Sequence, residues 1–86
     1  MARFIAVHTL PLTEEQVLPV ANDMVGKMPK GVSWKQTYCS FADHKFFCEW
    51  DVSSKAELEQ YFKAINMPVE AIYPVKLFDV ASRKMS

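Results

Sequence analysis

The 86-residue sequence lacks an excess of charge of either sign, because ten Lys and Arg residues balance ten Asp and Glu residues. Proteins that bind nucleic acid or anionic lipid usually carry a basic patch, so we expect neither partner. Long hydrophobic runs are also missing, since the longest apolar runs span only a few residues. A membrane-spanning helix needs about 20 apolar residues, and we therefore expect no membrane segment.

Cysteine and glycine are scarce, with two residues of each. Cys39 and Cys48 do not form a CxxC motif and are too few for a disulfide scaffold. The chain opens with Met1-Ala2-Arg3 and then a strand pattern, rather than with the apolar region of a signal peptide. These features favour a cytoplasmic protein with reduced thiols. The sequence shows no Gly-rich phosphate loop, no Ser/His/Asp arrangement and no paired catalytic carboxylates.

What the chain does contain is apolar side chains, at 50% of its residues, and aromatic ones, at 13%. Its length allows one domain, residues 1–86. A domain of this size buries only about 60–65% of the surface of its unfolded chain, so its own core is marginal. The rich apolar content therefore favours an apolar face that is buried against a partner.

The hydrophobic periodicity predicts four strands and two helices in the order βαββαβ. The predicted strands are Arg3–Thr9, Val32–Phe41, Lys45–Val52 and Ile72–Val80. Capping boxes at Thr13 and Ser54 begin the two helices, and the segments Met28–Gly31 and Asn66–Pro68 end them.

This order predicts an α+β, ferredoxin-like fold, in which both helices cover one face of a four-stranded antiparallel sheet. Pro74 lacks a backbone donor, which predicts an edge position for the last strand. The remaining Ala81–Ser86 is predicted to be a loose tail.

The alternation of side chains along each strand predicts which residues face the helices. A two-residue turn at Asp43-His44 would pair Cys39 with Cys48 and Tyr38 with Glu49. The residues then expected beneath the helices are Ile5, Val7, Thr37, Cys39, Phe41, Phe46, Cys48, Trp50, Val52, Val75 and Leu77. Those expected on the uncovered face are Phe4, Ala6, His8, Trp34, Gln36, Tyr38, Phe47, Glu49, Lys76 and Phe78. A three-residue turn would exchange the faces of one hairpin strand and divides the residues less consistently.

An uncovered sheet face with five aromatic residues is too apolar to remain in water. We therefore expect a homodimer that packs sheet against sheet, a dimeric α+β barrel. Such packing would enclose a cavity for a small-molecule ligand. The residues expected to line this cavity are Trp34, Tyr38, Phe47 and Lys76.

His8, Tyr38 and Glu49 are the candidate functional residues of that cavity. Imidazole, phenol and carboxylate groups suit a divalent metal such as nickel or zinc, or a proton-transfer step. The alternative is that His8 and Glu49 are hydrogen-bonded groups of the dimer interface. Lys76 is expected to pair with Glu49 or to bind an anionic ligand.

The cysteines and the aromatic sheet also have other interpretations. Cys39 and Cys48 are either metal thiolates, a redox pair or, as we favour, buried residues that act as small hydrophobes. Aromatic side chains on a ferredoxin-like sheet are typical of single-stranded RNA binding too. The RNA-recognition signature is absent, however, and Glu49 lies in the middle of the corresponding strand.

The segments Trp34–Tyr38 and Asp43–Trp50, together with Phe4-Ile5, Pro68 and Ile72, resemble a known family. It consists of small bacterial nickel-binding proteins with a ferredoxin-like fold. The resemblance implies a dimeric α+β barrel and binding of nickel or another divalent metal. Many members carry a histidine on the second helix where this chain has Tyr61, so one expected ligand is missing.

Three functions are therefore expected. The first is a small homodimer that binds a metal or small ligand at the uncovered sheet face. The second is a cofactor-free isomerase or monooxygenase, in which His8 or Glu49 has a shifted pKa inside an enclosed cavity. The third is a structural module whose uncovered face serves only for dimerisation.

Overall fold

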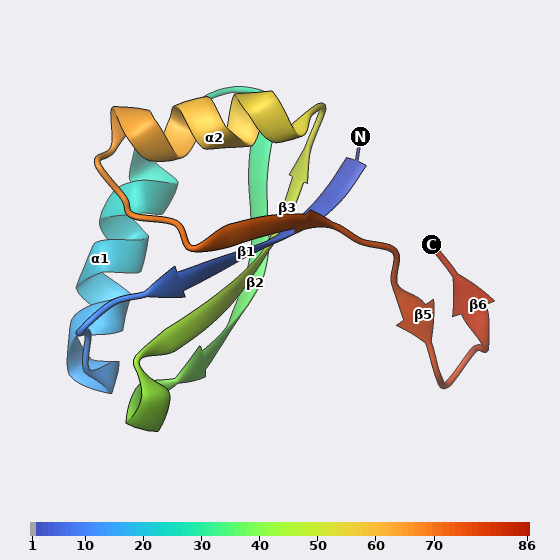
Figure 1. The fold of residues 1–86 in the computed structure, drawn as a ribbon, viewed down its shortest axis with the longest axis horizontal. Coiled ribbons are helices and arrows are strands. Elements are labelled where there is room, and N and C mark those ends of the chain that lie inside the picture. Colours follow the sequence, from blue (N-terminus) through green and yellow to red (C-terminus); the bar gives the residue numbers. More distant parts are fainter. Residues whose placement is uncertain (1) are drawn as a thin grey trace.

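The structure is a computed structural model that describes residues 2–86. It consists of a four-stranded antiparallel sheet, two α-helices, one short 3-10 helix and a separate C-terminal hairpin (Figure 1). The main-sheet strands are β1 (Ala2–Thr9), β2 (Val32–Ser40), β3 (Lys45–Val52) and β4 (Ala71–Pro74). The helices are α1 (Glu14–Gly26), α2 (Lys55–Ala64) and the short 3-10 helix η1 (Phe41–Asp43). The hairpin consists of β5 (Phe78–Asp79) and β6 (Lys84–Met85).

The strand order β2-β3-β1-β4, with α1 and α2 on the same side of the sheet, is the ferredoxin-like arrangement (Figure 1). The predicted fold class is therefore confirmed. β4 is an edge strand, as Pro74 predicted, because a proline in an inner strand would remove a ladder hydrogen bond.

Both helices begin where their capping boxes predict. The backbone N–H of Thr13 donates to Gln16 Oε1 at 2.9 Å, and Ser54 Oγ accepts the N–H of Glu57 at 3.2 Å. These contacts satisfy backbone donors that have no partner inside the first turn of a helix. Pro19 lies within α1, five residues after its first residue, and does not end the helix.

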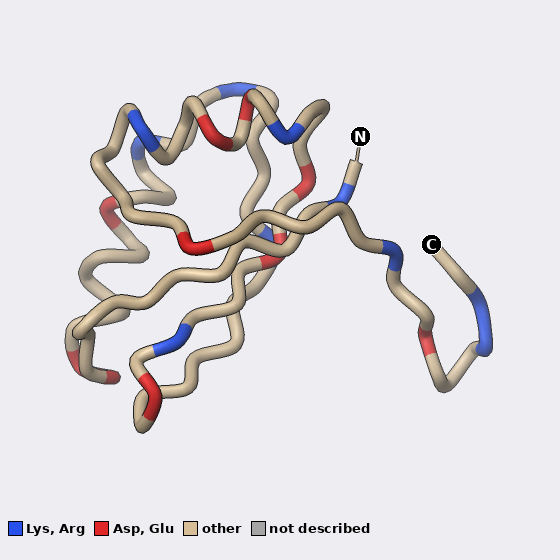
Figure 2. Tube along the Cα trace, viewed as in Figure 1, with Lys and Arg blue, Asp and Glu red and all other residues tan. Residues whose placement is uncertain are grey.

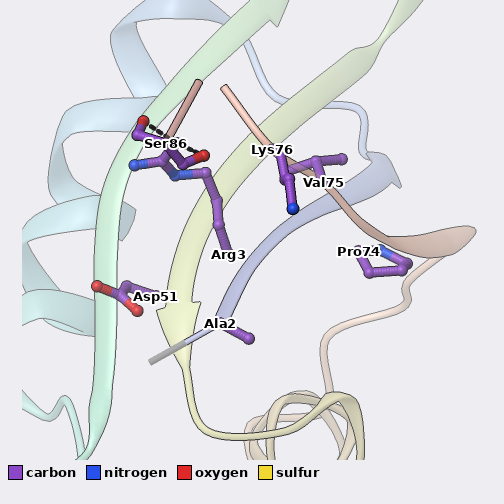
Figure 3. A pocket seen from close by; sticks show the side chains of 7 residues that line it. All are labelled: Ala2, Arg3, Asp51, Pro74, Val75, Lys76 and Ser86. Atoms are coloured by element: carbon purple, nitrogen blue, oxygen red, sulfur yellow. Dashed lines mark hydrogen bonds between the residues drawn. The ribbon is translucent and has the colours of Figure 1, made fainter. Parts of the chain in front are cut away.

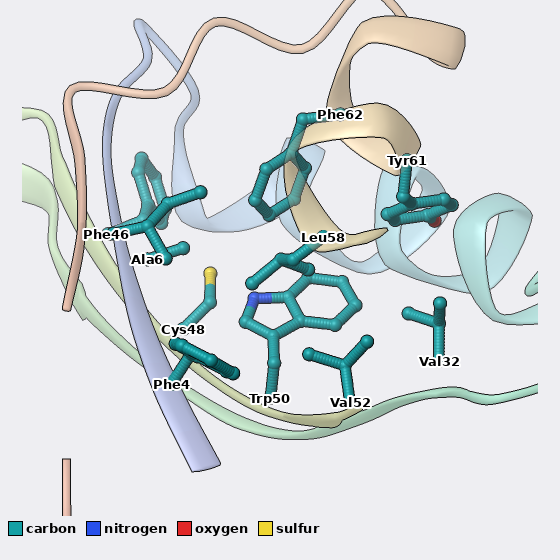
Figure 4. Packing of buried hydrophobic residues seen from close by; sticks show 11 residues of the cluster. Phe4, Ala6, Val32, Phe46, Cys48, Trp50, Val52, Leu58, Tyr61 and Phe62 are labelled. Carbon is teal, nitrogen blue, oxygen red and sulfur yellow. The ribbon is translucent and has the colours of Figure 1, made fainter. Parts of the chain in front are cut away.

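The core lies between α2 and the sheet (Figure 4). Trp50 of β3 is fully buried and meets Tyr61 and Phe62 of α2 edge-on, at ring centroid distances of 5.6 and 5.3 Å. Leu58 fills the remaining space beside them. Full burial of a side chain such as Leu or Phe contributes about 1.5–3 kcal/mol, so this cluster supplies much of the stability of the domain.

The hairpin between β2 and β3 is longer than predicted. Four residues, Phe41–His44, connect the strands, so Cys39 lies opposite Phe46 and Tyr38 opposite Phe47. The predicted two-residue turn is therefore wrong. Because the pairing is displaced by two residues, each side chain keeps its predicted face over this part of the hairpin. His44 closes the turn in the left-handed region, with a φ of 54°.

A β-bulge at Lys35 places the β2 residues that precede it on the opposite face of the sheet from the one predicted. Gln36 pairs with Glu49 but Trp34 pairs with Trp50, so Lys35 is the extra residue. Trp34 consequently lies on the helix side, where its ring stacks on Trp50 at 5.6 Å. The prediction that Trp34 faces outward is wrong.

The faces of β1 are also the reverse of those predicted. Phe4 pairs with Trp50 and His8 with Phe46, which places Phe4, Ala6 and His8 beneath the helices. Ile5 and Val7 lie on the uncovered face instead. β1 is an inner strand and is apolar on both faces, so its alternation does not identify the inner one.

The C-terminal segment is not a continuation of β4. The strand ends at Pro74, and the chain then forms the β5–β6 hairpin, which extends away from the domain (Figure 1). We call residues 77–86 the C-terminal arm. The predictions of a long last strand and a loose tail are therefore wrong. Lys76 and Phe78 do not lie on the main sheet, and neither do Val75 and Leu77.

Candidate functional site

His8 is buried on the helix side of the sheet, with 1% of its surface exposed. Its Nδ1 donates to the carbonyl oxygen of Pro68 at 2.8 Å, and its ring meets Phe62 of α2 edge-on at 4.9 Å. Burial lowers the pKa of His8, and the hydrogen bond to Pro68 opposes this only in part. The ring is therefore neutral at pH 7, with the proton on Nδ1 and a lone pair on Nε2.

The predicted cluster of His8, Tyr38 and Glu49 does not form. Tyr38 and Glu49 lie on the uncovered face, whereas His8 lies on the opposite side of the same sheet. A β-sheet separates its two faces completely, so no single metal ion can contact all three side chains. The predicted grouping is wrong because β1 presents His8 to the helices and not to the uncovered face.

Glu49 is held in place on the uncovered face by two neighbouring strands. Arg3 Nε lies 3.2 Å from Glu49 Oε2, and Gln36 Nε2 donates to Glu49 Oε1 at 2.9 Å. The partner of Glu49 is therefore Arg3 of β1, rather than the expected Lys76. The sequence pattern does not indicate Arg3, because its pairing with this carboxylate requires the correct face of β1.

Apolar side chains surround this ion pair on the uncovered face. Phe47 lies between Val7 of β1 and Tyr38 of β2, and Tyr73 of β4 lies beside Ile5. Tyr38 is 65% exposed and Tyr73 55% exposed. The face is therefore aromatic, as predicted, but it carries Tyr73, Ile5 and Val7. The residues Phe4, Trp34 and Phe78, which were expected on it, lie elsewhere.

A surface pocket of about 460 Å³ lies where β1 meets the C-terminal arm (Figure 3). Its lining residues are Ala2, Arg3, Asp51, Pro74, Val75, Lys76 and Ser86. Arg3 Nη1 donates to Ser86 Oγ at 3.3 Å, which ties the end of the arm to β1. Lys76 thus lines a pocket at the edge of the sheet. Elsewhere, charged residues of both signs are scattered over the helices and loops (Figure 2).

The two cysteines lie in different environments. Burial raises the pKa of the Cys48 thiol to about 11, although a hydrogen bond from Thr37 acts in the opposite direction. Cys48 is therefore a protonated, buried thiol at neutral pH, as favoured from the sequence. Cys39 is exposed on the edge strand β2, and the prediction that it is buried is wrong. Both are free thiols.

The family model described as nickel responsive protein SCO4226-like matches residues 4–75 of this chain. The chain belongs to this family. The matched stretch contains nearly all of β1 and all of β2, β3 and β4, and it excludes the C-terminal arm. The resemblance noted from the sequence is thereby confirmed. No curated protein matches the chain.

Among solved structures, the crystal structure of SCO4226 from Streptomyces coelicolor A3(2) is similar to this family member. The TM-score is 0.73 at 19% sequence identity, and the match covers 88% of this chain and 98% of that one. At this identity the comparison supports the shared fold.

The nickel named in the family description raises the question of whether this chain offers a metal site. Within residues 2–86, no group of three or more His, Cys, Asp and Glu side chains lies close enough together to hold a metal ion. His8 and Glu49 are on opposite faces of the sheet, and Cys48 is protonated at neutral pH. A single copy of the described chain therefore does not fit a metal ion. Neither α1 nor α2 is long and apolar enough to cross a membrane.

Proposed function

We propose that this protein is a homodimer that binds nickel, or another divalent transition metal, with donors from both copies. The family description supports a metal-related role. One copy offers no complete donor set among its described residues, so a site formed by two copies reconciles that description with the structure. Both cysteines are free thiols, and we therefore also propose a reducing, cytoplasmic location.

The observation that carries this proposal is the apolar character of the uncovered sheet face. Tyr38, Phe47 and Tyr73 remain exposed on it, next to Ile5 and Val7. Contiguous apolar surface of this kind marks an interaction site in a small soluble domain. A second copy packed sheet against sheet would bury it.

The C-terminal arm supports the same assembly. Its apolar side chains Leu77, Phe78, Val80 and Met85 are all exposed, and Val80 reaches 76%. The arm extends from the domain instead of folding back over its own core (Figure 1). A neighbouring copy would provide the surface that these side chains lack in a single chain.

Glu49 and Tyr38 are the donors that we propose for the metal, because they lie on the face that two copies would share. A two-fold axis through this face would bring two carboxylates and two phenols together. Glu49 has only 14% of its side chain exposed, and Arg3 and Gln36 already hold its carboxylate in one orientation. The side chain therefore loses little conformational entropy when it binds a metal ion. His8 is excluded from this site by its position beneath the helices.

The test combines oligomeric state with metal uptake. Light scattering after gel filtration should show a dimer for the wild type, and equilibrium dialysis should show that this dimer takes up nickel. Phe47→Glu places a charge on the shared face, so we expect a monomer whose nickel affinity falls by at least about tenfold. Gln60→Glu adds the same charge on exposed α2 surface and should behave as the wild type.

A third variant separates the metal from the interface. Glu49→Gln should keep the dimer but bind nickel more weakly, because the amide is a poorer ligand for a cation. A wild type that is monomeric at high concentration would contradict the dimer. Unchanged nickel uptake in the Phe47→Glu monomer would contradict the two-copy site.

A further inference from the structure

The C-terminal arm is a hairpin that places two large apolar side chains opposite each other. Phe78 of β5 pairs with Met85 of β6, so both side chains lie on the same face of the hairpin. They are 52% and 60% exposed. An isolated two-stranded hairpin is at best marginally stable in water. The arm therefore needs a surface that covers this apolar pair.

The arm leaves the main sheet at the end where β1 begins. Pro74, the last residue of β4, pairs with Phe4 of β1. The Val75 N–H then donates to the carbonyl oxygen of Arg3 at 3.1 Å, and the Arg3 side chain donates to Ser86 Oγ (Figure 3). Arg3 belongs to the uncovered face, so the arm is held on the side of that face. It also lies outside residues 4–75, the stretch that the family model matches.

The uncovered face differs in polarity between its two ends. The apolar row crosses the strands at one end and consists of Val7, Phe47 and Tyr38. The polar row crosses them at the other end and consists of Arg3, Asp51 and Ser33. The two rows are four residues apart along β1, which is about 13 Å in a β-strand. The arm begins beside the polar row and extends away from the domain, so it does not cover the apolar row of its own copy (Figure 1).

Two ways of stacking the uncovered faces about a two-fold axis differ in what they bring together. When the axis runs along the strands, the two apolar rows meet each other, and both arms stay at the opposite end. When the axis runs across the strands, the apolar row of one copy meets the end of the other copy where the arm begins. Only the second arrangement lets the apolar pair of each arm and the apolar row of each sheet cover one another.

We propose that the two copies stack with the axis across the strands, and that the arm of each copy packs Phe78 and Met85 on the apolar row of the other. The proposal rests on the homodimer proposed above. It assigns the relative orientation of the two copies and the surface that receives the arm.

Paramagnetic relaxation enhancement between two copies tests this contact directly. One sample carries a nitroxide label on Ser82→Cys, in the turn between β5 and β6, and Cys39→Ser removes the other exposed thiol. It is mixed with an equal amount of unlabelled-thiol protein that is enriched in ¹⁵N. We expect the amide signals of Tyr38 and Phe47 to broaden more than those of Ser33 and Asp51, because the arm reaches the apolar row of the ¹⁵N copy.

Two matched variants measure the contribution of the arm to the dimer. Phe78→Ser removes a ring that lies outside the core, and it should weaken dimerisation at least about tenfold in sedimentation equilibrium. Leu18→Ser removes an exposed apolar side chain of α1, which lies on the opposite side of the sheet, and should leave the dimer affinity unchanged.

The outcomes separate the arm contact from the dimer itself. Broadening of Phe47 that is no stronger than that of Ser33 would overturn the arm contact, and so would a Phe78→Ser dimer as tight as the wild type. Either result leaves the homodimer in place. A wild type that stays monomeric at high concentration would overturn both proposals.

Discussion

The two helices pack differently, although each begins at a predicted capping box. α2 buries Leu58, Tyr61 and Phe62 against the sheet, whereas α1 buries none of its residues. Leu18 and Val25 of α1 are exposed despite being apolar. The capping motif therefore determines where a helix begins, and it does not determine how closely the helix packs.

The difference follows from the size of the side chains that face the sheet. α2 presents a leucine and two aromatic rings, which reach Trp50 and fill the space to the sheet. α1 presents Val17, Ala21 and Met24, which are short or flexible, and a cavity remains beneath them. Because helices in small domains are stabilised mainly by tertiary packing, α1 should be the less stable of the two.

Truncation of one large side chain in each helix should give the largest contrast. Phe62→Ala removes a buried ring and should lower the free energy of unfolding by about 3–5 kcal/mol. Met24→Ala removes a half-buried side chain that already borders a cavity, so its cost should stay below about 1.5 kcal/mol. Urea denaturation of both variants measures these losses. Similar losses would show that α1 packs as tightly as α2.

The protonation of His8 should produce a smaller effect, on the side of the sheet where the helices pack. Burial lowers the pKa of His8 in the folded state below its ordinary value of about 6.5, so the unfolded chain binds the proton more strongly. The contribution of His8 to the free energy of unfolding is therefore fully present above pH 6.5, the ordinary pKa of histidine. This contribution is lost as the pH falls from 6.5 toward the lower pKa of the folded state. The slope should reach at most about 1.4 kcal/mol per pH unit.

Unfolding curves recorded between pH 7 and pH 5 test this effect against His8→Phe, which should lack the slope. Glu70 does not interfere in this range, because its hydrogen bond from Lys45 lowers its pKa and moves its titration to more acidic conditions. An equal slope in both proteins would assign the effect to another group.

Much of the fold could be predicted from the sequence because the local signals agree. Both capping boxes, the inward residues of α2 and the alternation of β3 from Phe46 to Val52 carry a single interpretation each. The edge position of β4 followed from Pro74. In each case one physical requirement leaves only one arrangement.

The candidate site could not be predicted, because it depends on signals that the sequence does not contain. Phe4 and Ile5 are equally suited to burial, so the face of β1 is set by its position between β3 and β4. The bulge at Lys35 turns Trp34 inward without any glycine to indicate it. The face of β1 alone separates His8 from Glu49 and places Arg3 beside that carboxylate.

Removal of the two capping residues should give the smallest effect and separates initiation from packing. Ser54→Ala deletes the hydroxyl that accepts a hydrogen bond from the Glu57 N–H. It should lower the free energy of global unfolding by about 1 kcal/mol, because α2 contributes buried side chains to the core. Thr13→Ala should cost less, since fraying of α1 exposes no buried side chain. Amide hydrogen exchange distinguishes the two: in the wild type, α1 amides should exchange through local opening and α2 amides only through global unfolding. Protection of α1 equal to that of α2 would mean that the half-buried residues of α1 stabilise it as strongly as the aromatic rings stabilise α2.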